Sequence, residues 1–485
     1  MADFLTAFGV IAAILLVTAL ASGLVQRSLL SFPLLCLVAG LILGEGVLGV
    51  FEVGAESESL EILATLTLAL VLFLDAVRLD PRDLGRRWLV PVLVLGPGTV
   101  LIISLGATSL ALILGFGWLL AFMGGAMLAS TDPVVLREIV RDERIPRSIR
   151  QVLTVEAGTN DLVVLPVILV LIAVAGSEVG GFGGWVEFAA KLALVGPLIG
   201  LVVGGGGSWL MTKVDAHMPV RREYQALYGI GIVLAAYTVA AAVGGDGFLA
   251  AFAAGLGVVL FNQTLCDCFL EYGEVTSEMA MLLAFVMFGS VLSGMFGEVD
   301  VLLTLLVAAI LIFLVRPGVL GIVLSRAKMS LEAHAFVSWF GPRGLNSLLL
   351  ALLAVHAGIE GAELLLATVG LVVLASTVVH GATATVASGW YERRAERLML
   401  AEEREGTAAG LFEHDETAIR RKKPVELRSL LDTEEPPPLI LDVRSRPSYE
   451  RDGAQIPGSV RVPPDRLSDW DPGDVGDRSI VAYCT

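Results

Sequence analysis

The sequence predicts an all-α polytopic membrane protein with thirteen transmembrane helices. Two observations predict this fold class. Hydrophobic residues make up 55% of the 485 residues and charged residues only 17%, whereas a typical soluble domain has about 25% charged residues. The chain also contains thirteen apolar runs that approach the roughly 20 residues needed to cross a bilayer. These runs cover approximately residues 4–25, 29–44, 60–77, 88–114, 119–136, 151–175, 185–211, 225–243, 247–261, 276–296, 299–324, 333–356 and 363–390.

Basic residues gather in every second loop between these runs, except in the loop at 262–274, which has none. Because Lys and Arg near span ends are retained on the cytoplasmic side, we expect the N-terminus outside and the C-terminus in the cytoplasm. The start of the chain lacks a basic region and a cleavage site, so we interpret it as a first span and not as a removable signal. The basic loops contain Arg27; Arg78, Arg82, Arg86 and Arg87; Arg141, Arg144, Arg147 and Arg150; Lys213, Arg221 and Arg222; Arg326 and Lys328; and Arg393 and Arg394.

Charge and cysteine content exclude several partners and cofactors. Acidic residues outnumber basic ones by 49 to 33, and a formal charge of −16 argues against a nucleic-acid partner. The four cysteines are too few and too scattered for a disulfide framework or a zinc site. We therefore expect a lipid bilayer around the protein, no nucleic-acid partner and no cofactor.

The composition changes abruptly after Trp390, where mixed charges replace apolar residues. We divide the chain into a transmembrane domain at 1–390, a cytosolic linker at 391–424 and a small, incomplete α/β domain at 425–485. Strands are expected from Leu439 and at 480–483.

Ionisable residues inside the predicted spans concentrate in four of them. Each such residue costs on the order of 2.5 to 3.5 kcal/mol on insertion scales, so each is a candidate functional residue. Snorkelling or loop anchoring explains Asp75 and Lys191 better than a functional role does. A lone histidine in a membrane span is more often a hydrogen-bonded interface residue than an ion ligand, so His334, His356 and His380 receive no role. The four clusters are Ser130 to Pro133, Glu156 to Asp161, Arg316-Pro317 and Gly341 to Gly344.

Two of the four spans should be broken near the middle of the membrane. Pro133 removes a backbone donor from the fifth span, and Gly341, Pro342 and Gly344 loosen the twelfth. Freed carbonyl groups and half-helix termini can coordinate a small ion. Matching breaks in the fifth and twelfth spans indicate two inverted six-helix repeats, with the seventh span as linker, which suits a transporter that works by alternating access.

The sixth span carries two acids with different expected roles. Glu156 and Asp161 lie five residues apart, about 500° of helix rotation, and therefore on related but different faces. Asp161 suits a group that accepts a proton or a cation, and Glu156 suits an ion pair. The spacing alone leaves both Arg316 and Arg343 as partners for Glu156. A single buried Asp can also simply cap a half-helix.

These motifs resemble the monovalent cation/proton antiporter family 1, the bacterial sodium/proton exchangers that are related to the animal exchangers. The resemblance covers roughly residues 5 to 390 in the family's order. The matching features are Leu72-Phe73-Leu74, Thr131-Asp132-Pro133, Glu156 with Asn160 and Asp161, Gly247 to Phe252 running to Gly255-Leu256, Arg316-Pro317, and Gly341-Pro342-Arg343-Gly344.

The resemblance implies a homodimer in the bacterial cytoplasmic membrane that exchanges a monovalent cation for a proton. Asp161 is then the carboxylate that binds Na⁺ or a proton competitively, with Thr131 and Asp132 lining the site. Glu156 pairs with a buried arginine, Arg316 in first place and Arg343 in second, and Asn160 steadies that network. Asn160 stands where electrogenic relatives carry a second Asp, which implies electroneutral exchange. Ala157 stands where many members of the family have a serine that helps line the site. The choice among Na⁺, Li⁺ and K⁺ as the transported cation therefore stays open.

The tail resembles a rhodanese, a persulfide-carrying sulfurtransferase domain. The matching residues are Leu441 to Arg444, Tyr449-Glu450, Ile456 to Ser459 and Val481 to Cys484, in which Cys484 matches the nucleophile. The loop that would lower the pKa of that thiol in the family follows the cysteine, and the sequence ends at Thr485. Either the sequence is a truncation or the domain is degenerate, and we expect a transporter and not an enzyme. The alternatives are an ion channel, for which no pore loop is visible, and a membrane-anchored sulfurtransferase or sulfur sensor, for which one span would be enough.

Overall fold

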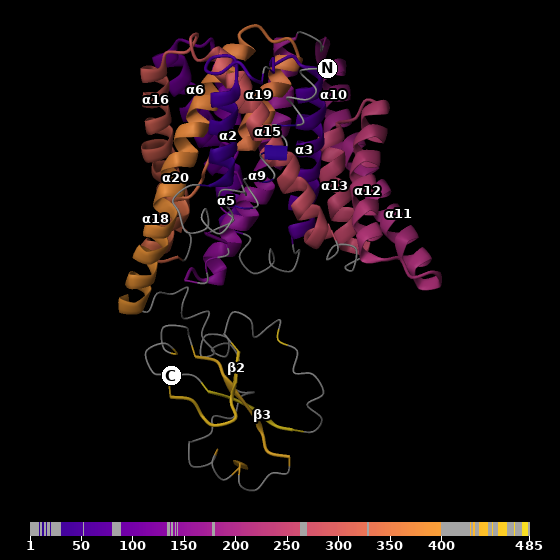
Figure 1. Cartoon of the computed structure of the whole chain (residues 1–485), viewed down its shortest axis with the longest axis vertical. Helices are drawn as coiled ribbons and strands as arrows, with labels where there is room; N and C mark the ends of the chain where they lie inside the picture. Colours follow the sequence, from indigo (N-terminus) through magenta and orange to yellow (C-terminus); the bar gives the residue numbers. More distant parts are fainter. Residues whose placement is uncertain are drawn as a thin grey trace. The chain divides into compact units, whose positions relative to one another are not determined.

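The computed structural model is mainly helical, with a small parallel sheet near the C-terminus (Figure 1). It describes residues 31–51, 53–79, 89–132, 144–176, 180–261, 269–326, 329–398, 436–444, 454–462 and 478–483, and isolated residues between these ranges. The chain divides into two compact units. The first comprises Met1–Glu138, Val152–Ala327 and Val337–Thr385, and the second Ile139–Gln151, Lys328–Phe336 and Val386–Thr485.

Within the described residues, eight helical segments are long and apolar enough to cross a membrane, and four further apolar helices are shorter. The chain is therefore a multi-pass membrane protein. The twelve predicted spans from 29–44 onward each have a helical counterpart, whereas the predicted first span at 4–25 lies outside the described ranges. The helices are α2 (Phe32–Leu43), α3 (Glu58–Arg78), α5 (Leu89–Leu93), α6 (Thr99–Leu114), α7 (Trp118–Met127), α9 (Arg147–Ala175), α10 (Gly181–Ala190), α11 (Gly196–His217), α12 (Arg222–Ala242), α13 (Gly247–Phe261), α15 (Glu274–Met295), α16 (Val301–Ile310), α17 (Arg316–Val323), α18 (Leu331–Trp339), α19 (Leu345–His356) and α20 (Ala362–Leu398).

In the described part of the chain, three spans consist of two α-helices joined by a π-helical turn, and each turn lies at a proline. Val94–Gly98 contains Pro97 and joins α5 to α6. Lys191–Val195 precedes Gly196-Pro197, and Leu311–Val315 precedes Arg316-Pro317. Because proline lacks an N–H group and its ring clashes with the carbonyl four residues back, widening one turn lets the helix continue past it.

Glycine lets neighbouring helices of the first unit pack with their backbones in contact. A Cβ atom added at Gly40 of α2 would overlap the Val286 carbonyl of α15. Gly200 and Gly204 of α11 meet the backbone of α13 in the same way. Without a hydrophobic driving force between helices in lipid, such close approach is a main source of helix association.

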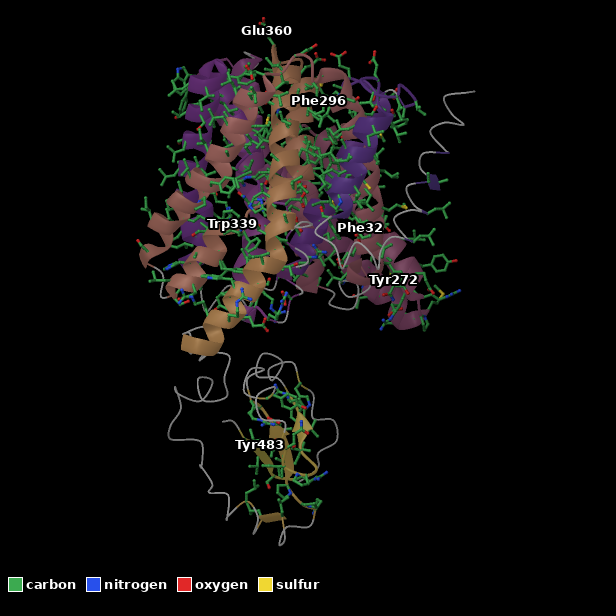
Figure 2. The ribbon with its side chains drawn as sticks, turned by 60° about the vertical axis from the view of Figure 1, so that its left-hand side comes forward. Phe32, Tyr272, Phe296, Trp339, Glu360 and Tyr483 are labelled. Carbon is green, nitrogen blue, oxygen red and sulfur yellow. The ribbon has the colours of Figure 1, made fainter. Side chains whose placement is uncertain are left out.

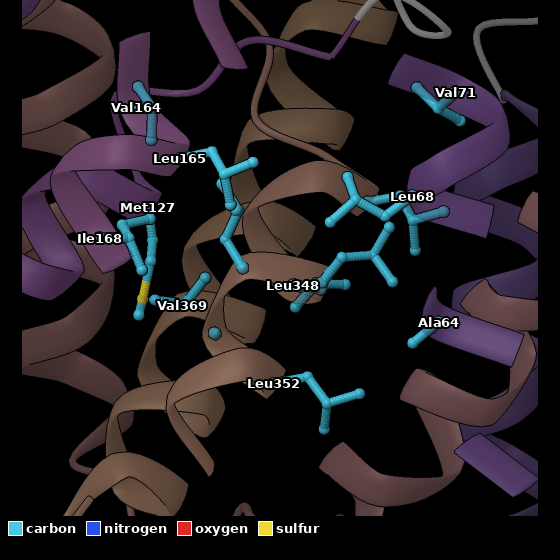
Figure 3. Packing of buried hydrophobic residues seen from close by; sticks show 14 of the residues in the cluster. Ala64, Leu68, Val71, Met127, Val164, Leu165, Ile168, Leu348, Leu352 and Val369 are labelled. Atoms are coloured by element: carbon cyan, nitrogen blue, oxygen red, sulfur yellow. The ribbon is translucent and has the colours of Figure 1, made fainter. Parts of the chain in front are cut away.

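An apolar cluster connects α3, α7, α9, α19 and α20, among other helices, in the interior of the first unit. Figure 3 shows Leu68 of α3 facing Leu348 of α19, with Leu165 of α9 close by. Ile168 of α9 lies beside Met127, the last residue of α7. This cluster packs the unbroken helices α3 and α9 against the ends of α7 and α19, where the polar motifs begin.

In the second unit, α20 continues to Leu398 beyond the expected boundary at residue 390, because Glu, Arg, Ala and Leu are good helix formers. The tail contains a parallel sheet in the order β2 (Val460–Arg461), β1 (Leu439–Asp442), β3 (Ile480–Tyr483), which includes both expected strands. Burial of Asp442 would raise its pKa, but hydrogen bonds from Arg444 hold the pKa below its ordinary value. Cys484 lies outside the described residues, so the resemblance to rhodanese stays a prediction.

Candidate functional site

Two interrupted helices meet in the interior of the first unit. The chain is non-helical from Leu128 to Asp132 after α7, and from 340 to 344 between α18 and α19. The Asp132 N–H donates to the Pro342 carbonyl at 2.9 Å and joins the two unwound segments. Figure 2 shows Trp339, the last residue of α18, between the end of the helix bundle that carries Glu360 and the end that carries Tyr272. Pro133 lies outside the described residues.

Each unwound segment supplies a charged side chain that caps the other broken helix. Nη1 of Arg343 donates to the carbonyls of Ala129 and Ser130 at 2.8 and 2.9 Å, just beyond the C-terminus of α7. Oδ2 of Asp132 accepts the Leu345 N–H at 2.8 Å, at the N-terminus of α19. A cation at a helix C-terminus and an anion at an N-terminus complement the helix dipoles. Asp132, expected to line an ion site, therefore has a capping contact as well.

The two glycines of the Gly341-Pro342-Arg343-Gly344 motif provide space for charged side chains. A Cβ atom at Gly344 would overlap the Asp132 carboxylate, and one at Gly341 would overlap the Arg316 guanidinium. Any larger residue at either position would displace a charged group that holds the crossing together.

Glu156 and Arg316 form a buried ion pair. Arg316 Nη1 lies 2.7 Å from Glu156 Oε1, and the side chains are only 3% and 4% exposed, respectively. Nη2 of Arg316 also donates to the Phe340 carbonyl at 2.5 Å, beyond the C-terminus of α18. Of the two arginines that the sequence left open, the structure pairs Arg316 with Glu156.

Asp161 lies between the two interrupted helices. Its side chain is buried, and each of its two carboxylate oxygens accepts a hydrogen bond. Ser130 Oγ, beyond the end of α7, donates to Oδ1, and Asn346 Nδ2, in the first turn of α19, donates to Oδ2 at 2.5 Å. Among the described residues, Asp161 thus meets neutral donors, whereas Glu156 meets a guanidinium.

Asn160, the neighbour of Asp161 on α9, holds the unwound segment after α7. Its Nδ2 donates to the Ala129 carbonyl at 2.8 Å and to Thr131 Oγ1 at 3.3 Å. In the part of the chain that the structure describes, the buried Asn160 Oδ1 accepts no hydrogen bond. The structure therefore brings Thr131, Asp132, Asn160 and Asp161 together, and Arg343 reaches the same place from the second unwound segment.

Sequence reasoning missed Asn346, and it interpreted His380 as an interface residue without a functional role. Nε2 of His380, on α20, lies 3.2 Å from the Trp339 carbonyl oxygen, and Nδ1 lies 3.2 Å from Ser376 Oγ. The same Ser376 Oγ accepts a hydrogen bond from the backbone N–H of Arg343 at 2.9 Å. His380 therefore supports the second unwound segment. For Asn346, a signal was present: it is an amide in a mainly apolar helix, two residues after a glycine break.

The capping contact of Asp132 predicts a difference between two variants. Asp132→Ala removes the acceptor for the Leu345 N–H and should cost about 1 kcal/mol of stability, whereas Asp132→Asn keeps a side-chain oxygen and should cost only a few tenths. Thermal melts of the detergent-solubilised variants measure this. Equal melting of both variants would show that the Asp132 oxygen does not act as a cap.

Comparisons with known proteins agree with this architecture. A family profile described as "Sodium/hydrogen exchanger, transmembrane" matches residues 11–388. The K(+)/H(+) antiporter NhaP of Alkalimonas amylolytica is 25% identical over 388 residues, which are 79% of this chain and 66% of the relative. NhaP2 of Shewanella sp. strain MR-4, also named a K(+)/H(+) antiporter, is 26% identical over 400 residues, 80% of this chain and 67% of the relative.

A solved structure shares the fold. The sodium proton antiporter MjNhaP1 of Methanocaldococcus jannaschii at pH 8 superposes with a TM-score of 0.65 at 20% identity, covering 80% of this chain and 100% of MjNhaP1. The chain spans about two thirds of the length of the curated relatives that it matches. With a profile match over most of its length and reciprocally capped broken helices at its centre, this chain belongs to the sodium/hydrogen exchanger family of monovalent cation/proton antiporters.

Proposed function

We propose that this protein exchanges a monovalent cation for a proton across the bacterial cytoplasmic membrane, and that Asp161 binds the two competitively. The observation that carries the proposal is the environment of Asp161. It is a buried carboxylate that contacts both interrupted helices through neutral donors.

The other buried charges at the crossing have electrostatic partners in the protein. Glu156 pairs with Arg316, Arg343 meets the carbonyls at the end of α7, and Asp132 meets the N-terminus of α19. An ionised carboxylate is costly in a low-dielectric interior unless an opposite charge accompanies it. Neutral donors only partly compensate for that cost, so either a proton or a cation completes the Asp161 site.

Two inverted repeats and alternating access belong to the proposal. The reciprocal capping of α7 by Arg343 and of α19 by Asp132 supports them, because equivalent breaks face each other. A second correspondence lies seven spans apart, where π-helical turns occur next to Pro97-Gly98 and Pro317-Gly318. Such pairs are the sequence signature of a site at a repeat interface. The homodimer, with the N-terminus outside and the C-terminus in the cytoplasm, stays a prediction.

Asp161 at the centre also supports electroneutral exchange, because one carboxylate accepts either one proton or one monovalent cation. Thr131 and Asp132 are proposed to line the same site from the unwound segment after α7, and Asn160 to hold that segment in place. The cation is Na⁺, K⁺ or Li⁺. The relatives are named K(+)/H(+) antiporters and the solved neighbour a sodium proton antiporter, so both ions belong in the first assay.

The direct test uses purified protein in liposomes that contain a pH-sensitive dye. Gradients of NaCl, KCl and LiCl are imposed in turn, and proton movement is followed against liposomes without protein. The proposal requires that at least one of the three cations drives proton movement in the opposite direction. Absence of cation-driven proton movement with all three would refute it.

Competition for Asp161 predicts a pH signature. Acid should raise the apparent KM for the transported cation, because a protonated Asp161 has no charge to offer it, and at alkaline pH that KM should level off. The effect is measured from initial rates at several cation concentrations between about pH 6 and 9. Buried carboxylic acids can titrate in this range. His334→Ala should leave the shape of the profile unchanged. A KM that is constant over this range would exclude competition at one carboxylate.

A further inference from the structure

We propose that Asn346 is a cation ligand that helps determine ion specificity: its amide donates to the Asp161 carboxylate in the structure and would turn its carbonyl oxygen towards a bound cation. This inference rests on the proposed exchange function and adds a residue from the second interrupted helix to the ion site. Asn346 is 2% exposed and lies in the first turn of α19, directly after the unwound segment.

The contact between Asn346 and Asp161 defines which end of the amide faces the carboxylate. The two side chains are 2.5 Å apart between Nδ2 and Oδ2. An ionised carboxylate is acceptor-only, so the amide must present its NH₂ group to it. In the structure, Asn346 therefore satisfies the carboxylate oxygen that would otherwise be open to a cation.

A rotation of the terminal amide group exchanges the nitrogen for the oxygen without moving the backbone. The rotation replaces a donor with a neutral oxygen, and carbonyl and carboxylate oxygens are the ligands that hard cations prefer. If Asp161 carries a proton, the same oxygen accepts a hydrogen bond from the acid. One amide can thus complement the ionised, the cation-bound and the protonated carboxylate.

The surroundings of Asp161 leave few other oxygen ligands on this side. Ala157, one turn before Asp161 on the same face of α9, has only a methyl group. Leu165, one turn after it, and Leu348 on α19 lie in the apolar cluster (Figure 3). A cation at Asp161 loses much of its hydration here. Ser130 and Asn346, whose side chains touch the carboxylate, can replace water beside the Thr131 and Asp132 oxygens that are proposed to line the site.

Three variants separate a ligand from a mere hydrogen-bond donor. Asn346→Leu keeps the approximate volume and removes both the NH₂ group and the oxygen. Asn346→Asp removes the NH₂ group but keeps oxygen at the same distance from the backbone. Ser347→Ala is the matched control, because this neighbouring hydroxyl on α19 is fully buried and has no hydrogen-bond partner among the described residues.

The experiment measures proton flux in liposomes against NaCl, KCl and LiCl at one alkaline pH, with apparent KM and maximal rate determined for each salt. Asn346→Leu should raise the KM of the transported cation about tenfold or more, as expected for loss of a contact to a charged group. The ratio of KM values among the three cations should change as well. Asn346→Asp should keep the wild-type KM or lower it, and Ser347→Ala should behave like wild type.

The outcomes distinguish this inference from the proposed function. Failure of the wild type to exchange any of the three cations refutes the function itself. If the wild type exchanges and the KM rises equally in Asn346→Leu and Asn346→Asp, only the NH₂ group matters and the proposed cation ligand is refuted. If the KM of Asn346→Leu equals that of the wild type, Asn346 does not belong to the site. If Asn346→Leu does not fold, Asn346→Ala takes its place. Thermal stabilisation of each purified variant by the same salts gives a readout of binding that is independent of transport.

Discussion

Asp161→Asn is expected to abolish cation-driven proton movement and to leave the protein folded. The substitution keeps the side-chain volume and one oxygen, so the contact with Ser130 is retained, but it removes the charge for which proton and cation compete. Loss of an essential binding group should reduce the rate to the background of liposomes without protein. The measurement is proton flux with Na⁺, K⁺ and Li⁺ gradients, together with size-exclusion chromatography and a thermal melt of the variant.

A matched control comes from a carboxylate outside the crossing. Asp246 Oδ1 accepts the Leu249 N–H at 2.7 Å near the start of α13, and Asp246→Asn keeps that acceptor while removing the charge. This control should retain exchange. Sodium- or potassium-driven proton movement by Asp161→Asn at a rate similar to that of the control would show that Asp161 is not the exchanging group.

The second large effect concerns the ion pair of Glu156 and Arg316. Glu156→Leu removes the carboxylate without a large change in volume and leaves a guanidinium buried in a low-dielectric interior. Breaking such a pair costs about 3 to 5 kcal/mol, whereas replacing both partners by apolar residues costs much less. The double variant Glu156→Leu with Arg316→Met should therefore melt at a higher temperature than Glu156→Leu alone.

A double-mutant cycle of thermal melts in one detergent provides the measurement. Arg316 also donates to the Phe340 carbonyl, so the double variant should remain less stable than wild type. The control is Glu363→Gln, which removes an exposed carboxylate from the first turn of α20. If Glu156→Leu melts like this control, the ion pair contributes nothing to stability.

The sequence by itself determined the membrane class, the spans from 29–44 onward and the position of the break in the twelfth span. These features depend on short-range properties of the chain. A run of apolar residues partitions into lipid wherever its neighbours are, and Pro342 with its flanking glycines interrupts a helix by local geometry. The predicted spans from 29–44 onward therefore have helical counterparts, and the predicted break in the twelfth span lies at 340–344.

Only the tertiary structure decided which polar groups meet. Spacing along α9 places Glu156 on a face but does not say whether Arg316 or Arg343 lies opposite, because that depends on how helices far apart in the sequence cross and rotate. The same holds for Asp132, whose contact with the α19 N-terminus joins residues 213 apart. Asn346 contacts Asp161 across 185 residues. Helix periodicity fixes directions within one helix, and the packing of several helices fixes the distances between them, so the partners of each buried charge follow from the fold.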